Sequence, residues 1–385
     1  MTTSTPPYVT WARADARRIR RQFLDRPADA PPAAVAAAML GAHAQVLSAA
    51  ELSVALRRAE GTRADVRAAL WQDRTLVKTY GPRGTVHLLP ADDLPMWTGA
   101  LSALPAGKSG QPPHVRMTAA QTDEVVAAVA DALTDAELTV DELTDAIVAR
   151  TGPWAGERVM DAFQDKWPRW RQVTHLAAHR GVLCFGRDRG RKATYTNPGV
   201  RPATGGRATG ELVERYLRAY GPATPGNLAK WLAAPAGWAT ELFGSLAAAG
   251  RIEEVSFDGA TAWVAAGDTD FPDERPPAGV RLLPYFDAFA VASQPRERLF
   301  PGKAHDRALA GGQAGNHPVL LVDGTVAGVW HQRRSGKRIA VTVEPLRKLP
   351  TARLRDLEAE AERVAELLEG RAELTVGPVT VGPHA

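Results

Sequence analysis

His43 and Gln45 are two polar side chains, two positions apart, inside an otherwise apolar run that extends from Ala33 to Leu47. An imidazole can accept a proton near neutral pH, and a primary amide both donates and accepts hydrogen bonds. Such a pair has the chemistry to position a water molecule for a hydrolytic reaction. The simpler interpretation makes both residues the polar end of a helix, bonded to backbone, and for the pair taken alone it is the favoured one.

Other residue patterns associated with catalysis are incomplete in this chain. His175 and His179 have the spacing of helical zinc ligands, but Leu176 occupies the position of a metalloprotease glutamate, and no third ligand has a persuasive spacing. The glycine-rich segments lack the Lys-Ser/Thr of a phosphate loop. Ser293 and Ser335 lack the context of a nucleophile elbow. We therefore expect a protein that works without a metal ion or an organic cofactor.

Basic side chains gather in short segments, although the formal net charge of the chain is only +4. Clusters that recur at equivalent places in successive units would form the basic stripe of a nucleic-acid-binding protein. For any single cluster, a solvated arginine-rich loop is the favoured interpretation. The clusters are Arg17, Arg18, Arg20 and Arg21; Arg187, Arg189, Arg191 and Lys192; and Arg333, Arg334, Lys337 and Arg338.

The single cysteine, Cys184, excludes an intramolecular disulfide and fits a reducing compartment. No apolar stretch is as long as a membrane span, and the N-terminal residues lack the charged and apolar regions of a signal peptide. We therefore expect a soluble, cytoplasmic protein without a membrane partner.

The elements that position these residues begin with helices and end in a hairpin. The predicted helices cover 11–24, a stretch from about 33 through the His43 and Gln45 segment, a stretch that starts at 48 or 51, and 63–71. Strands at 75–80 and 85–89 then flank a turn that carries Arg83. Helices followed by a two-stranded hairpin with a basic tip predict a winged helix-turn-helix.

The same order of elements recurs twice. The second unit has predicted helices at 118–133, 139–150 and 157–180 and strands on both sides of a loop at 186–191; the third has helices at 211–220, 224–232 and 238–249 and a hairpin at 252–257 and 261–264. Thr139 followed by Glu142 is a capping-box signature that fixes one helix start. The recurrence predicts a repeat architecture more strongly than any one motif does.

The third predicted helix of the second unit has the place of a recognition helix, and the loop after its first strand has the place of a wing. Contacts with DNA phosphates are the favoured role for these polar residues, with a plain solvated face as the alternative. The residues concerned are Arg169, Arg171, Gln172 and His175 on the helix and Arg187, Arg189, Arg191 and Lys192 on the wing.

From Pro276 onward the sequence pattern indicates mostly strands. The predicted strands cover 281–287, 318–322, 325–331, 338–343 and 373–376, with one helix at 351–368. This order predicts a small β-barrel or curled sheet capped by a helix. The whole chain is therefore expected to be α+β, with winged helices at 1–110, 111–203 and 204–272 and the barrel at 273–385.

Several segments, in this order, resemble the AlkZ/YcaQ superfamily of bacterial DNA glycosylases. The segments are Leu40-Gly41-Ala42-His43-Ala44-Gln45, Arg83-Gly84-Thr85-Val86-His87-Leu88-Leu89, Leu282-Leu283-Pro284-Tyr285-Phe286-Asp287 and Val322-Asp323-Gly324-Thr325-Val326-Ala327-Gly328-Val329-Trp330. The resemblance covers nearly the whole chain. It implies excision of bulky N7-alkylguanine adducts and interstrand crosslinks, in some members for self-resistance to a DNA-alkylating antibiotic.

The resemblance also assigns the catalytic motif, which is Gln-Φ-Gln or Gln-Φ-Asp in the family, where Φ is apolar. Here it reads His43-Ala44-Gln45, which resembles a His-Φ-Gln subgroup associated with self-resistance. His43, with a reference pKa of ~6.5, would accept a proton from the attacking water or orient it. Gln45 would hold the water or the deoxyribose. In the rival assignment both residues are simple water ligands.

We therefore expect a monofunctional DNA glycosylase, probing double-stranded DNA as a monomer. A crosslinked or intercalated guanine is hard to flip from the duplex, so the resemblance implies a channel that accepts the lesion in place. Arg333, Arg334 and Lys337, at a predicted hairpin tip, would contact a groove of that DNA, and a solvated tip is the alternative. The other functions considered are a non-catalytic winged-helix regulator and a drug-sequestering protein.

Overall fold

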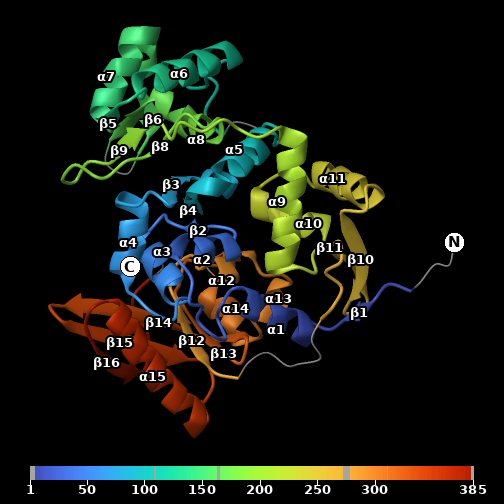
Figure 1. Cartoon of the computed structure of the whole chain (residues 1–385). Helices are drawn as coiled ribbons and strands as arrows, with labels where there is room; N and C mark the ends of the chain where they lie inside the picture. Colours follow the sequence, from blue (N-terminus) through green and yellow to red (C-terminus); the bar gives the residue numbers. More distant parts are fainter. Residues whose placement is uncertain (1–4, 108–109, 163–164, 272–277, 310, 383–385) are drawn as a thin grey trace.

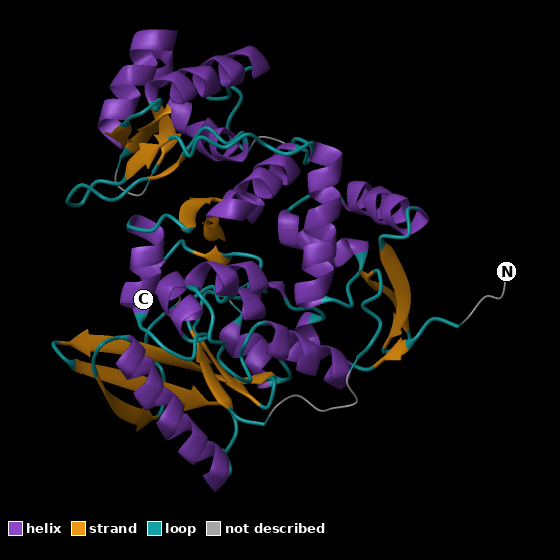
Figure 2. Ribbon diagram, viewed as in Figure 1, coloured by secondary structure: helices purple, strands orange, loops and turns teal. Residues whose placement is uncertain are grey.

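The computed structural model describes residues 5–107, 110–162, 165–271, 278–309 and 311–382. Helices and strands are interspersed along the chain, which confirms the predicted α+β class (Figures 1 and 2). Within these ranges no helix is both long and apolar enough to cross a membrane. The predicted boundary at 272–273 falls outside the described residues.

The first group of elements surrounds a three-stranded sheet with the order β2-β4-β3. Its elements are α2 (Pro32–Ala38), β2 (Ala42–His43), α3 (Leu47–Ala55), α4 (Arg63–Trp71), β3 (Leu76–Tyr80), the 3-10 turn η1 (Pro82–Gly84), β4 (Val86–Pro90), η2 (Ala91–Asp93) and α5 (Leu94–Ser102). Thr62 and Asp65 form a capping box at the start of α4, which fixes where this helix begins. The predicted hairpin of this group is confirmed.

The predicted helix through His43 and Gln45 is wrong. Helix α2 ends at Ala38, because Leu40 and Gly41 have positive φ angles of 57° and 91° that turn the chain out of the helical path. A side chain at position 41 would also lie 2.7 Å from the Leu89 side chain, so this position needs glycine. The chain then enters β2, which places His43 on a strand.

The start of the chain packs against a much later part of it. Strand β1 (Tyr8–Val9) pairs in parallel with β10 (Ile252–Phe257), and α1 (Trp11–Arg21) follows. The guanidinium of Arg18 is buried and donates to three backbone carbonyl groups, while that of Arg21 forms an ion pair with Asp268. The first basic cluster therefore fastens α1 to its neighbours.

The second group lies at one end of the molecule, opposite the C-terminal sheet (Figure 1). Its elements are α6 (Ala119–Ala132), β5 (Glu137–Thr139), α7 (Val140–Thr151), η3 (Pro153–Gly156), β6 (Arg158–Asp161), β7 (Lys166–Pro168), η4 (Arg169–Val173), α8 (Thr174–His179), β8 (Cys184–Phe185) and β9 (Thr194–Thr196). The predicted capping box of Thr139 and Glu142 is present.

The predicted helix at 157–180 is wrong. The chain forms the hairpin β6–β7 there, then a 3-10 turn and the short helix α8. Pro168 explains much of the difference, because proline disfavours helical geometry in the residue before it and has no amide hydrogen to donate.

The third group agrees with its predicted order of three helices and a hairpin. Its elements are α9 (Gly205–Tyr220), α10 (Pro225–Leu232), α11 (Ala236–Ala248), β10 and β11 (Ala260–Ala265). Thr224 and Asn227 form a capping box that starts α10.

The C-terminal group is built on an open sheet and not on the predicted barrel. The order β12-β13-β14-β15-β16 leaves β12 and β16 at opposite edges, and no pairing among the described residues joins them. The elements are β12 (Val280–Leu283), α12 (Ala288–Ala292), α13 (Arg296–Leu299), α14 (Lys303–Ala308), β13 (Val319–Val322), β14 (Thr325–Ser335), β15 (Arg338–Pro345), α15 (Thr351–Leu367) and β16 (Arg371–Val376). Because β16 runs parallel to β15 and α15 connects them, the chain caps the sheet instead of closing it.

Apolar cores extend across the groups. One core joins the first group to the C-terminal sheet, with Ala42, Leu52 and Leu88 in the same cluster as Trp330 and Ile339. A second core joins α5 to the helices of the third group. Packing of this kind holds the surroundings of β2 in a fixed arrangement, because buried side chains in a close-packed core have few alternative positions.

Candidate active site and DNA-contacting residues

His43 lies on β2, directly opposite His87 of β4 in an antiparallel register. Its ring is stacked on that of Phe286, with centroids 4.5 Å apart, and meets the His87 ring edge-on at 5.0 Å. Only 7% of His43 is exposed. The imidazole is therefore held between two rings, which fixes its orientation.

A cavity of about 340 Å³ opens beside His43. Its walls come from three of the four groups, and they include the cationic side chains of Arg83, Lys230 and Arg296. The full lining is His43, Arg83, Thr85, Asn227, Lys230, Trp231, Phe286, Val291, Ala292, Gln294, Arg296, Gly312, Gln313, Ala314 and Asn316. The cations suit the phosphates of a nucleic acid.

Phe286 is placed against His43 by its neighbour in the chain. Phe286 has a positive φ of 56°, an uncommon backbone state for a bulky residue. The next residue, Asp287, is fully buried and accepts two hydrogen bonds from Arg57 and one from Ser53 of α3. The ion pair of Arg57 with Asp287 joins the first group to the C-terminal group beside the cavity. It therefore fixes the position of the neighbouring Phe286 ring, on which His43 stacks.

Burial lowers the pKa of His43 from 6.5 to about 4, with a further contribution from the charge of Arg83. Burial likewise holds the pKa of His87 well below its ordinary value. Both imidazoles are therefore neutral at pH 7. A neutral imidazole of low pKa is a weak base but still orients water through hydrogen bonds.

Gln45 is exposed and adjoins the buried His43. Its backbone amide points to His43 Nδ1 at 3.5 Å, the outer limit of a hydrogen bond. The expected pair is thus one buried ring in a cavity wall and one exposed amide at the surface. The structure brings the two residues together, but the Gln45 side chain does not line the cavity.

Arg83 lies at the cavity and not at an exposed wing tip. Its Nη1 donates to the carbonyl oxygen of Trp231 at 2.7 Å, and burial lowers its pKa. Arg83 therefore connects η1 to α10. The other N–H groups of its guanidinium are the ones that it can offer to a ligand.

The residues expected on a recognition helix have structural partners. Arg169 donates to the carbonyl oxygens of His114 and Val115 and pairs with Glu157, and Gln172 donates to Val115 as well. These contacts fasten η4 to the preceding loop. Neither side chain is presented to a groove by a continuous helix.

Arg171 and His175 have different surroundings. The guanidinium of Arg171 stacks over Trp167, at 4.1 Å from the ring centroid, and 41% of Trp167 is exposed. His175 is half-buried beside Gly84, and burial lowers its pKa. In the described part of the chain no group of three or more His, Cys, Asp or Glu residues is arranged to hold a metal ion.

The predicted wing residues fall into two classes. Arg189 pairs with Glu142, and Lys192 pairs with Asp141. Arg187 and Arg191 are exposed, and neither side chain has a hydrogen-bond or ion-pair partner among the described residues. Exposed cations without an internal partner are the ones available to phosphates.

Arg333, Arg334 and Lys337 lie at the tip of the β14–β15 hairpin, as expected. Arg334 donates to the carbonyl oxygens of Gly336 and Leu368, so it stabilises the tip itself. The exposed side chains of Arg333 and Lys337 have no hydrogen-bond or ion-pair partner within the described ranges.

Comparison with known proteins shows which family the chain belongs to. The family model described as "DNA glycosylase AlkZ-like" matches residues 36–367, which is most of the chain. The chain belongs to the AlkZ-like DNA glycosylases. A curated relative from Streptomyces sahachiroi, named interstrand DNA cross-link repair glycosylase, is 32% identical over 375 residues, covering 93% of this chain and 96% of that protein. The solved structure of Streptomyces sahachiroi DNA glycosylase AlkZ is similar with a TM-score of 0.80 and 29% identity, covering 96% of this chain and all of that one.

This AlkZ-like chain is therefore an enzyme that acts on DNA, as the family resemblance implied. The sequence reasoning did not assign Phe286, Asp287, Lys230 or Arg296 to the site. Phe286 and Asp287 belong to a segment that carries the family resemblance, but their spacing in the sequence does not show that they contact α3 and His43. Lys230 and Arg296 had no signal, because they reach the cavity only through the packing of the groups.

Proposed function

We propose that this DNA glycosylase hydrolyses the N-glycosidic bond of bulky N7-alkylguanine adducts, including interstrand crosslinks, and serves self-resistance to a DNA-alkylating natural product. The observation that carries the proposal is a neutral, ring-stacked His43 in the wall of a cationic cavity, next to an exposed Gln45. The crosslink repair in the name of the Streptomyces relative supports the lesion class.

The chemistry of N7-alkylguanine suits so spare a site. Alkylation at N7 makes the base cationic, so it departs as a neutral molecule and needs no general acid. The protein has to position one water molecule for attack on an oxocarbenium-like sugar and to exclude unproductive positions of that water. Neutral polar groups are sufficient for that task.

In this proposal His43 orients the water and does not remove its proton before attack. A pKa of about 4 makes the imidazole a poor base at pH 7, whereas a general base works best when its pKa is near the working pH. Gln45, which is exposed at the surface, holds the same water or the deoxyribose. Arg83, Lys230 and Arg296 contact the phosphates that flank the lesion.

We also propose that the first three groups are winged helices and that the DNA crosses the surface they share. Support comes from their common order of helices followed by paired strands. Arg187, Arg191, Arg333 and Lys337 are the outer phosphate contacts, because these exposed cations have no hydrogen-bond or ion-pair partner within the described residues. The enzyme acts as a monomer on double-stranded DNA and without a cofactor.

The direct test is base release from defined duplexes. The protein is incubated with duplexes that hold one N7-methylguanine or one N7-benzylguanine, and abasic sites are revealed by alkaline cleavage. We expect release in both cases and its loss in the double variant His43→Ala, Gln45→Ala. Absence of release from both lesions, with DNA binding intact, would refute the proposal and leave a DNA-binding protein.

A further inference from the structure

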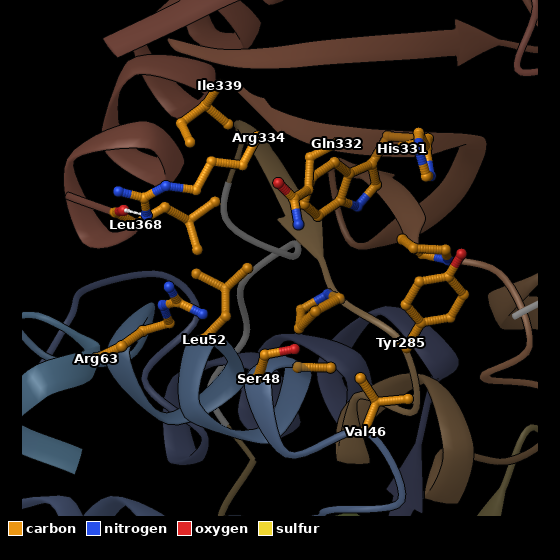
Figure 3. A pocket seen from close by; sticks show the side chains of 14 residues that line it. Val46, Ser48, Leu52, Arg63, Tyr285, His331, Gln332, Arg334, Ile339 and Leu368 are labelled. Carbon is orange, nitrogen blue, oxygen red and sulfur yellow. Dashed lines mark hydrogen bonds between the residues drawn. The ribbon is translucent and has the colours of Figure 1, made fainter. Parts of the chain in front are cut away.

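A second cavity, of about 250 Å³, lies between α3 and the C-terminal sheet (Figure 3). Val46, Ser48 and Leu52 approach it from the α3 side, while Gln332, Arg334 and Ile339 approach it from the sheet. The full lining is Val46, Ser48, Ala49, Leu52, Arg63, Pro284, Tyr285, Pro318, Trp330, His331, Gln332, Arg334, Ile339 and Leu368. We call this space the α3 cavity.

The α3 cavity shares a wall with the His43 cavity. One chain segment contributes His43 to the first space and Val46 to the second, and a second segment contributes Phe286 to the first and Tyr285 to the second. Exposed Gln45 lies on the segment between them. A ligand held at His43 and Gln45 therefore has the α3 cavity as its immediate neighbour.

Apolar side chains form the larger part of the α3 cavity wall, and its polar members are Ser48, Arg63, Tyr285, His331, Gln332 and Arg334. Leu52, Trp330 and Ile339 are buried. The apolar part of the wall, which includes the ring of Trp330, suits an apolar ligand group.

We propose that the α3 cavity receives the alkyl substituent of the lesion while the guanosine is held at His43. The inference rests on the proposed function and specifies its substrate: a compact, ring-bearing, mostly apolar group that fits a space of about 250 Å³. Substrate size is thus selected by a space separate from the one that handles water.

The test uses uncleavable duplexes, so that binding is measured without base release. The probes carry 7-deazaguanine bearing a methyl or a benzyl group on C7, the carbon that replaces N7. We expect the wild-type enzyme to bind the benzyl probe about tenfold or more tightly than the methyl probe, since apolar contacts of this size discriminate by such factors. The variant Ser48→Trp, which fills the cavity from an exposed position, should abolish this preference, whereas Ser48→Ala should keep it.

If Ser48→Trp does not fold, Val46→Trp at the same wall replaces it, since Val46 is also exposed.

Three results would overturn the inference. The first is that the wild-type enzyme shows no preference for the benzyl probe, and the second is that a folded tryptophan variant keeps the preference. The third is that the tryptophan variant loses as much affinity for undamaged DNA as for the benzyl probe. The last would show that the α3 cavity contacts ordinary DNA. Failure of the proposed function is detected by a separate measurement, the base-release assay, as absence of N7-methylguanine release.

Discussion

Lowering the pH tests whether His43 works as a neutral side chain. His87 lies against its ring, Arg83, Lys230 and Arg296 line the same cavity, and among the described residues no carboxylate lines it. With a pKa of about 4, His43 stays about nine-tenths or more neutral at pH 5.5, whereas at its ordinary value of 6.5 only about one-tenth would be neutral. We therefore expect single-turnover release of N7-methylguanine to be constant from pH 8 to 5.5 and to decline only as the pH approaches 4.

Variants assign the acidic decline to His43. His43→Gln should remove the decline and keep the plateau rate within about tenfold, because an amide can also orient water, whereas loss of a general base costs about 10²–10⁴. Arg83→Met should move the decline to higher pH, since the charge of Arg83 lowers the His43 pKa, and Arg83→Lys keeps that charge as the matched control.

Folding must be checked by circular dichroism at each pH. Protonation of a histidine with a lowered pKa favours the unfolded state, so stability falls as the pH drops below about 6.5. A decline centred near pH 6.5 in a folded enzyme, or a plateau rate reduced a hundredfold or more in His43→Gln, would refute the water-orienting role.

Three further predictions concern the surroundings of the site. Asp287→Asn should lower the free energy of unfolding by about 3 kcal/mol, measured by urea denaturation, because the buried Arg57 loses its counterion; a change below about 1 kcal/mol would contradict this. Phe286→Leu should slow single-turnover release about tenfold with unchanged DNA affinity, since the ring that orients the imidazole is lost; loss of affinity alone would argue for a DNA contact instead. Replacing Arg333 and Lys337 with alanine should lower the salt dependence of DNA binding by about two counterions, measured by fluorescence anisotropy, and an unchanged slope would show that the tip does not touch DNA.

Local signals in the sequence were sufficient for much of the fold. Capping residues such as Thr139 with Glu142 fix where helices begin, and alternation of apolar residues gives the hairpins of the first and third groups. These signals act over a few residues, so they do not depend on the packing of distant segments. Errors arose where the backbone changes direction without a change in hydrophobic pattern, as at Leu40 and at Pro168.

The candidate site likewise contains residues that local sequence signals identify and residues that only the fold brings together. His43 and Gln45 were identifiable because polar residues in an apolar run and the family motif point to one place. Phe286 and Asp287 required the fold, since α3 and the segment after β12 meet through long-range contacts such as the hydrogen bond of Ser53 with Asp287. The closed barrel failed because strand patterns do not say whether the two edges of a sheet meet.

The buried pair of Arg57 and Asp287 joins residues 230 positions apart in the chain. During synthesis on the ribosome, Arg57 emerges long before the carboxylate that balances it, and Phe286 arrives with that carboxylate. The wall behind His43 is therefore completed only after Asp287 has been made, 230 positions after Arg57. A chain released before that point would hold His43 and Gln45 but not the ring on which His43 stacks, so the stacked arrangement forms only after Phe286 has been made.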